Sequence, residues 1–193
     1  MADTIRIGMI SGSLRTGSYN RKLVEYVAKN VLDSTDAELV DISLAELDLP
    51  MFSEDLEAVE FPASALKLKE LMMSCDTILI ASPEYNGSLS GALKNAIDWA
   101  SRPREGEAPL ACFKGKTAGL LSASPGAIGG LRGLRHVRQI LTQLQMYVSP
   151  IEFALGSAHA AFDDHGNITD ERAAASAQRV GEDMIQLCRA LHK

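Results

Sequence analysis

The sequence predicts an α/β protein with a doubly wound, five-stranded parallel sheet and helices on both of its faces. Short apolar runs alternate along the chain with segments of helical length and periodicity. The third strand-like run, Asp76–Ser82, is almost continuously apolar, which is typical of a parallel strand buried on both faces. The chain has 193 residues and no long polar linker, so residues 1–193 are expected to form a single domain.

Each predicted strand is a short apolar run bounded by polar or turn-forming residues. The run "IRIGMI" follows a polar start of the chain, and "DTILIAS" is the most continuously apolar of the series. The five predicted strands are Ile5–Ile10, Ala37–Ser43, Asp76–Ser82, Thr117–Ala123 and Met146–Phe153.

The predicted helices carry apolar residues at spacings of three and four, the period of a helix with one buried stripe. After the first strand this spacing runs from Leu23 to Val31. The stretch from Asp48 to Pro62 is rich in turn-forming residues and is expected to be a loop. Thr169 is the expected N-cap of the closing helix. The other helices are predicted around residues 65–72 and at Gly91–Ala100, Leu131–Leu144 and Thr169–Leu191.

Composition excludes several classes of protein. No apolar run approaches the roughly 18 residues of a membrane span, and the first residues lack a basic stretch followed by an apolar signal region, so a cytoplasmic location is expected. A formal charge of -6 argues against nonspecific nucleic-acid binding. Three widely spaced cysteines indicate neither a disulfide framework nor a zinc site, and are interpreted as structural thiols: Cys75, Cys112 and Cys188.

The candidate site lies where three loops follow predicted strands, starting at Ser11, Ser82 and Ser122. In open sheets of this kind, ligands bind outside the carboxyl ends of the strands, near the point where the strand order reverses. Loops after the first, third and fourth strands can lie on one rim of such a sheet. We therefore expect them to form one site.

The first loop, "SGSLRTGSYNR", has the composition of a phosphate-binding turn. The first turn of a helix has unpaired N–H groups and a partial positive charge, which stabilise a phosphate. The alternative is an ordinary turn capped by a serine. The Walker and dinucleotide glycine patterns are both absent, which favours a mononucleotide with one terminal phosphate. The candidate phosphate ligands are Ser13, Arg15, Ser18 and Asn20.

The second and third loops can approach a planar ligand. Pro83 stiffens the second loop and Asn86-Gly87 favours a turn, so Glu84 and Tyr85 would be held above the strand end. The alternative is that this segment is only a turn. In the third loop, Ser124-Pro125-Gly126 and Gly129-Gly130 are compatible with a close approach to a ligand or with a simple turn.

Two segments together carry a resemblance to a known family. "GSLRTGSYNRKL" and "SPEYNGSLSGALKNAIDWASRP" resemble the NADPH-dependent FMN reductases of flavodoxin-like fold, which include bacterial quinone, chromate and azo-dye reductases. The resemblance implies bound FMN, with its phosphate on the first-loop residues and its isoalloxazine edge against the second loop. The implied ring contacts are Pro83, Glu84, Tyr85, Asn86 and Gly87, with Ser124 and Gly126 flanking the flavin.

The same resemblance implies the chemistry and the partners. NADPH or NADH would reduce the flavin. Quinones, free flavins, azo compounds or metal oxyanions such as chromate would then accept the electrons, so the enzyme would follow a ping-pong mechanism. No catalytic side chain is required, because flavin N5 carries the reaction. Glu84 is not expected to act as a general acid, since nothing near it in sequence raises its pKa. The family implies a homodimer or a homotetramer.

Two other functions are compatible with parts of the sequence. A flavodoxin-type electron carrier would bind FMN without turning over NAD(P)H itself, although Arg15 and the modest net charge disfavour it. A metal-dependent enzyme would use His159, Asp163, Asp164 and His165, although the same residues are typical of a polar turn.

Overall fold

Five parallel strands form the main sheet of the computed structural model, which describes residues 4–191. Their spatial order is β2–β1–β3–β6–β7, so the chain first moves outward from β1 to β2 and then crosses back to build the other half. This order confirms the predicted doubly wound, flavodoxin-like fold. The strands are β1 (Ile5–Ser11), β2 (Ala37–Ile42), β3 (Thr77–Ala81), β6 (Thr117–Ala123) and β7 (Tyr147–Leu155).

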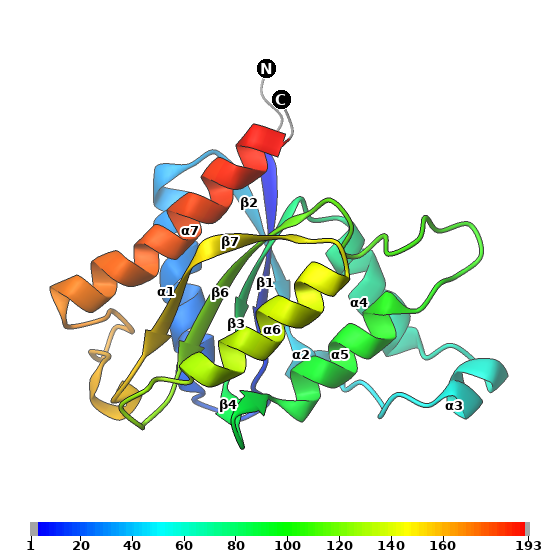
Figure 1. Cartoon of the computed structure of the whole chain (residues 1–193), viewed down its shortest axis with the longest axis horizontal. Helices are drawn as coiled ribbons and strands as arrows, with labels where there is room; N and C mark the ends of the chain where they lie inside the picture. The colour runs from blue at the N-terminus through cyan, green and yellow to red at the C-terminus, as the bar shows by residue number, and fades with distance from the viewer. Residues whose placement is uncertain (1–3, 192–193) are drawn as a thin grey trace.

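Helices cover both faces of the sheet (Figure 1). On one face, α1 (Tyr19–Ser34) packs beside α7 (Glu171–Leu191) and buries the stripe from Leu23 to Val31 that the periodicity predicted. Within residues 4–191, no helix is both long and apolar enough to cross a membrane. The opposite face is covered by α2 (Leu44–Leu47), α4 (Ala63–Met73), α5 (Gly91–Ser101) and α6 (Leu131–Gln143).

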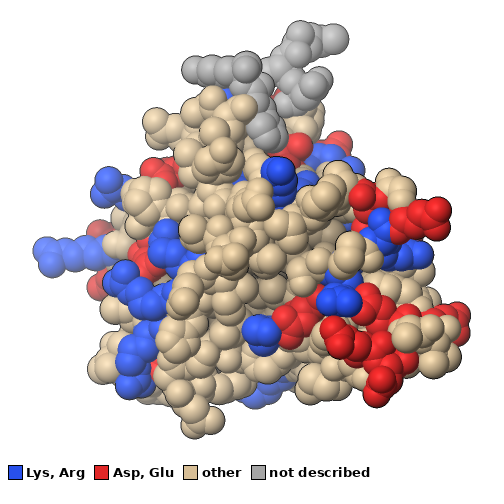
Figure 2. Space-filling view, turned by 45° about the vertical axis from the view of Figure 1, so that its right-hand side comes forward, with Lys and Arg blue, Asp and Glu red and all other residues tan. Residues whose placement is uncertain are grey.

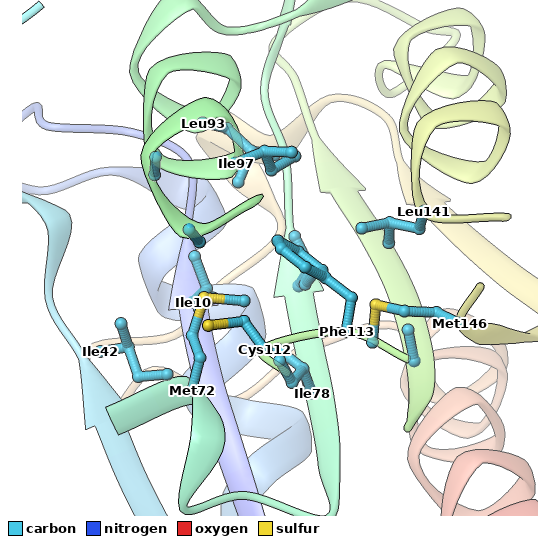
Figure 3. Packing of buried hydrophobic residues seen from close by; sticks show 14 of the residues in the cluster. Ile10, Ile42, Met72, Ile78, Leu93, Ile97, Cys112, Phe113, Leu141 and Met146 are labelled. Atoms are coloured by element: carbon cyan, nitrogen blue, oxygen red, sulfur yellow. The ribbon is translucent and has the colours of Figure 1, made fainter. Parts of the chain in front are cut away.

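The connection between α5 and β6 is part of the core. Phe113, in this connection, is 0% exposed, and Figure 3 shows its ring among the apolar side chains that include Ile97 of α5 and Leu141 of α6. Burying a side chain of this size stabilises the fold by about 1.5–3 kcal/mol. The end of the connection, at Cys112 and Phe113, therefore fills space in the core, whereas residues 103–106 are exposed.

A buried lysine holds the same connection in place. The ammonium group of Lys69 in α4 donates to the carbonyl oxygen of Arg102 at 2.7 Å and pairs with the Glu107 carboxylate at 2.8 Å. Its side chain is only 3% exposed. A buried charge of this kind is tolerated because it is both paired and hydrogen-bonded.

Two sequence predictions of local structure are wrong. The expected loop contains a helix, α3 (Glu54–Val59), which buries no residue and so has no apolar stripe to reveal it. Thr169 is not the N-cap of the last helix, because α7 begins at Glu171 and the Asp170 carboxylate accepts the Ala173 N–H at 2.7 Å. The carboxylate of Asp170 takes the capping position one residue later than predicted.

Acidic side chains are unevenly distributed over the surface. Figure 2 shows them gathered on one side of the molecule, and α3 and its flank contribute the exposed Glu54, Asp55 and Glu60. In Figure 1, α3 lies to the right of the sheet, whereas β4 (Glu84–Tyr85) lies at its lower edge. The negative formal charge of the chain therefore does not imply a negative site at the strand ends.

Candidate functional site

Three loops line one cavity at the carboxyl ends of the strands. They follow β1, β3 and β6, and the cavity has a volume of about 370 Å³. The expectation that these loops meet is confirmed. The lining residues are Ser13, Arg15, Ser18, Tyr19, Asn20, Pro83, Glu84, Tyr85, Ala123, Ser124 and Pro125.

Ser18 occupies the start of α1. Its Oγ accepts the N–H of Arg21 at 3.4 Å, and only 2% of the residue is exposed. Ser18 is therefore an N-cap, as the alternative interpretation of the loop proposed, and it also lines the cavity. Because a hydroxyl both accepts and donates, capping the helix leaves the O–H proton of Ser18 for a ligand in the cavity.

Arg15 is the cation of the first loop. Its guanidinium donates to the carbonyl oxygen of Gly17 at 3.2 Å and lies 5.2 Å from the centroid of the Tyr19 ring. Among the described residues it pairs with no carboxylate, so most of its five N–H donors are available to an anion. Tyr19 is a cavity residue that the sequence reasoning missed. Its position between Ser18 and Asn20 was the available signal.

Asn20 has a structural contact that the sequence did not reveal. Its amide N–H donates to the carbonyl oxygen of Ala123 at 2.9 Å, and its amide oxygen accepts the Ala123 N–H at 2.9 Å. These two bonds join the first turn of α1 to the end of β6. One amide hydrogen of Asn20 is left for a ligand, so its contact with a phosphate stays a prediction.

The second loop is a tight hairpin. β4 pairs with β5 (Ser88–Leu89), and the connecting residues Asn86 and Gly87 have φ values of +53° and +78°. Two positive φ values define the turn that matches the twist of a two-residue hairpin. Neither residue lines the cavity, whereas Pro83 and Tyr85 do. Flavin contacts of Asn86 and Gly87 therefore stay predictions, and their turn is the observed role.

The carboxylate of Glu84 is held by α6. Its oxygens accept the Nε–H of Arg132 at 2.8 Å and the N–H of Gly133 at 3.1 Å. Burial alone raises the pKa of Glu84, but these hydrogen bonds and the charge of Arg132 outweigh burial and lower the pKa below its usual value. Glu84 is consequently ionised at neutral pH and is not a proton donor, as the sequence reasoning expected.

Gly129 and Gly130 are required by packing within the protein. Their φ values are +67° and +94°, in the left-handed region. A Cβ at Gly129 would lie 2.7 Å from the carbonyl carbon of Ala154, and one at Gly130 would lie 2.0 Å from the Oγ of Ser122. Packing of the turn alone is therefore enough to require the glycine pair, and its close approach to a ligand stays a prediction.

Ser124 and Gly126 differ in their relation to the cavity. Ser124 lines it, together with the neighbouring Pro125 that the sequence reasoning did not assign. Gly126 does not line it. Its N–H donates to the Oγ of Ser124 at 3.2 Å, and its carbonyl oxygen accepts the Gly129 N–H at 3.2 Å. Its flavin contact stays a prediction.

The candidate metal loop is a hydrogen-bonded turn. The carboxylate of Asp163 accepts the N–H groups of His165 at 2.9 Å and Asn167 at 2.8 Å, and hydrogen bonds from Asn167 and His165 lower its pKa. In the described part of the chain, no three His, Cys, Asp or Glu residues come together as a set of metal ligands. The observed bonds are those of the polar turn.

The three cysteines are buried free thiols. Burial raises the pKa of Cys75 and Cys188, and raises that of Cys112 to about 11. A thiol with a raised pKa is protonated at neutral pH and is a poor nucleophile. This supports the interpretation of all three as structural.

Comparison with known proteins decides the family. The family model described as NADPH-dependent FMN reductase matches residues 5–160, which include all three cavity loops. The chain belongs to this family. Members of the NADPH-dependent FMN reductase family use FMN and a reduced nicotinamide, so the chain is an oxidoreductase with FMN as cofactor and NAD(P)H as cosubstrate.

Individual relatives cover almost the whole chain. An NAD(P)H-dependent FMN reductase of Pseudomonas aeruginosa is 41% identical over 174 residues, which are 90% of this chain and 89% of the relative. A quinone reductase of Pseudomonas putida is 37% identical over 89% of this chain and 88% of its own. Both relatives are reductases, so the comparison supports an enzyme that uses NAD(P)H and does not support a flavodoxin-type electron carrier.

A solved structure agrees with the sequence relatives. The flavoenzyme NAD(P)H:(acceptor) oxidoreductase of Paracoccus denitrificans superposes with a TM-score of 0.82 at 32% identity, covering 97% of this chain and 98% of its own. The cavity fits a flavin mononucleotide in chemical terms. One end combines a helix N-terminus, hydroxyls and a guanidinium, and the other end combines a proline, a tyrosine and main-chain groups.

Proposed function

We propose that this protein binds FMN in the three-loop cavity and reduces quinones with NAD(P)H. The observation that carries the proposal is the cavity itself, which joins an anion site at the start of α1 to the second and third loops. When bound, FMN supplies the two-electron chemistry of its ring. The side chains bind and orient it.

The first loop is proposed to hold the phosphate. The N–H groups of the first turn of α1 and its partial positive charge attract an anion. Ser13 and Ser18 donate hydroxyl hydrogens, and Arg15 adds a charge-assisted hydrogen bond. Asn20 contributes its remaining amide hydrogen while its bonds to Ala123 fix the helix start against β6.

The second and third loops are proposed to hold the ring. Pro83, Tyr85 and the main chain at Glu84 meet one edge, and Ser124 meets it from β6. Main-chain N–H groups of this kind stabilise negative charge on a reduced ring, as an oxyanion hole stabilises an alkoxide. The side chain of Glu84 takes no part in proton transfer, because it is ionised and engaged by α6.

Loss of a charge partner tests the phosphate site. Arg15→Ala removes a charge-assisted hydrogen bond worth about 1.5–3 kcal/mol, so the dissociation constant of FMN is expected to rise about 10- to 150-fold. The dissociation constant of riboflavin, which lacks the phosphate, should hardly change. Fluorescence titration of flavin measures both values. Equal weakening of FMN and riboflavin would show that Arg15 does not bind the phosphate.

The reaction order and the acceptor are tested by steady-state kinetics. We propose a ping-pong order, because the three loops border one cavity in which the nicotinamide and the acceptor would meet the same surface of the flavin. Quinone reductases among the relatives, such as the 2-hydroxy-1,4-benzoquinone reductase of a Burkholderia species at 33% identity, support quinones as acceptors.

Initial rates at varied NADPH and quinone should give parallel double-reciprocal lines, and intersecting lines would contradict the order. The value of kcat/KM should be higher for a benzoquinone than for free FMN, an azo dye or chromate. A higher value for any of these three would replace the quinone as the proposed acceptor.

We further propose a homodimer formed through α5 and α6. A second cavity of about 710 Å³ lies between these helices. Lys94 and Asp98 in its lining pair with each other at 2.7 Å, and the apolar residues that lie among its polar ones are proposed to meet a second copy. The apolar lining residues are Leu89, Ile97, Ile140 and Leu144.

Light scattering measures the oligomeric state. Ile140→Glu should give a monomer, because a carboxylate in an apolar interface is costly to desolvate. Val59→Glu is the control, since Val59 is 86% exposed on α3. A dimer that survives Ile140→Glu would place the contact elsewhere, and a tetramer in the unsubstituted protein would require a second interface.

A further inference from the structure

We propose that Glu84 is a positioning residue that joins the second loop to α6 and thereby fixes the ring end of the cavity. This inference rests on the proposed function, because it assumes that the cavity binds a flavin. It assigns to the Glu84 carboxylate a task separate from any contact with the flavin: holding the hairpin that borders the cavity against the helix that follows the third loop.

Glu84 lines the cavity, and its carboxylate contacts the start of α6. Its carboxylate binds the Arg132 side chain at 2.8 Å and the Gly133 main chain at 3.1 Å. The Glu84 side chain is 8% exposed, whereas that of Arg132 is 67% exposed. The Glu84 carboxylate is therefore the buried member of the pair, and the arginine that binds it is exposed.

α6 has no side-chain cap of its own. Its N-cap is Gly130, which makes no capping hydrogen bond. A capping serine or aspartate cannot replace it, because φ is +94° and the space for a Cβ is taken by Ser122. Glu84 supplies the missing negative charge at the positive end of this helix from another segment of the chain.

The hairpin also touches the main chain of α6. A Cβ at Gly133 would lie 3.1 Å from the carbonyl oxygen of Ser88 and 3.3 Å from the Cβ of Glu84. Glycine at this position lets β4 and β5 approach the helix backbone. The second loop and the segment that leads from the third loop into α6 consequently form one block, so the spacing between the two ring-side loops depends on the carboxylate.

Glu84→Gln is the informative variant, because glutamine keeps the size and removes the charge. The control is Glu152→Gln. Glu152 also pairs with an arginine of α6, Arg138 at 2.7 Å, and its side chain is 10% exposed, but it lies on β7 and does not line the cavity. Glu84→Gln removes one carboxylate–arginine pair with α6, and Glu152→Gln removes two, because Glu152 also pairs with Arg135 at 3.5 Å. Only Glu84→Gln concerns the ring-side loops.

The dissociation constants of FMN and riboflavin and the visible circular dichroism of bound flavin are measured for each variant. Glu84→Gln should weaken both flavins by a similar factor, about tenfold for a lost charge-assisted bond, and should change the dichroism spectrum. Glu152→Gln should change neither, even where it lowers the melting temperature equally. A role confined to stability would move only the melting temperature.

Two results would overturn the inference while leaving the proposed function intact. The first is Glu84→Gln protein that binds both flavins like the unsubstituted protein, with the same dichroism. The second is Glu152→Gln protein in which the affinity for both flavins falls by the same factor as in Glu84→Gln. Failure of the unsubstituted protein to bind FMN would instead overturn the proposed function, so the two failures are distinguishable.

Discussion

Gly129 allows a quantitative test of how tightly the third loop is packed. Its backbone lies in the left-handed region at φ +67°, and a Cβ would lie 2.7 Å from the carbonyl carbons of both Ala154 and Leu155. These are main-chain atoms of β7, which cannot turn aside as a flexible side chain can. Gly129→Ala therefore combines a backbone penalty with a steric penalty.

Two other glycines separate the penalties. Gly166 has φ +80° with no atom within 4 Å of an added Cβ, so Gly166→Ala carries only the left-handed cost of about 1–2 kcal/mol. Gly126 has an ordinary φ, and the nearest atom is 3.7 Å away, so Gly126→Ala should change stability by no more than about 0.5 kcal/mol. Overpacking adds about 1–3 kcal/mol, which gives about 2–5 kcal/mol for Gly129→Ala.

Denaturant unfolding followed by the fluorescence of Trp99, the single tryptophan of the chain, measures these differences. In a protein of this size about 1 kcal/mol corresponds to roughly 2–4 °C in Tm, so thermal melting provides an independent check. Gly126→Ala is expected to be the most stable of the three variants, Gly166→Ala the next, and Gly129→Ala the least stable. If Gly129→Ala were as stable as Gly166→Ala, the loop would not be packed on β7 as described.

Three further predictions concern other parts of the molecule. Gly87→Val places a β-branched residue at φ +78° and should lower quinone reductase turnover by a larger factor than Gly166→Val, with melting temperatures of the two variants as the control. Lys69→Met leaves the Glu107 carboxylate without its cation. It should lower the free energy of unfolding, measured by urea titration, by about 3 kcal/mol. Because hydrogen bonds from α6 hold the pKa of Glu84 below its usual value, its stabilising effect is complete at neutral pH and is lost as the pH falls through the folded-state pKa. The stability difference from Glu84→Gln should therefore be constant above about pH 5 and shrink in acid, and a difference that grew in acid would contradict it.

Much of the fold follows from the sequence because hydrophobic burial has a readable period. The predicted strand Thr117–Ala123 coincides with β6, and the stripe from Leu23 to Val31 is buried in α1. α3 escaped prediction because it buries nothing and therefore leaves no pattern. The burial of Phe113 in a connection was also invisible, since only the tertiary fold brings that segment between α5 and α6.

The candidate site was predictable in location but less so in the role of each residue. The rule for parallel sheets placed three loops on one rim, and they line one cavity. A polar side chain, however, can form the same kind of hydrogen bond with a ligand or with another part of the protein, and the sequence does not distinguish the two. Asn20 was predicted from its amide, yet both ends of that amide bind Ala123, 103 positions away in the chain. No local pattern contains that information.

These internal bonds hold the loops of the proposed flavin site in place without a ligand. A loop that orders only on binding subtracts its conformational entropy from the affinity, whereas a loop already held in place does not. Asn20 fixes the first loop to β6, and Glu84 fixes the second loop to α6. In the proposed role, the carboxylate of Glu84 contributes to affinity without contacting the flavin, whereas Asn20 is also proposed to donate to the phosphate. Substitution of Glu84 should therefore weaken flavins with and without a phosphate alike, unlike substitution of Arg15.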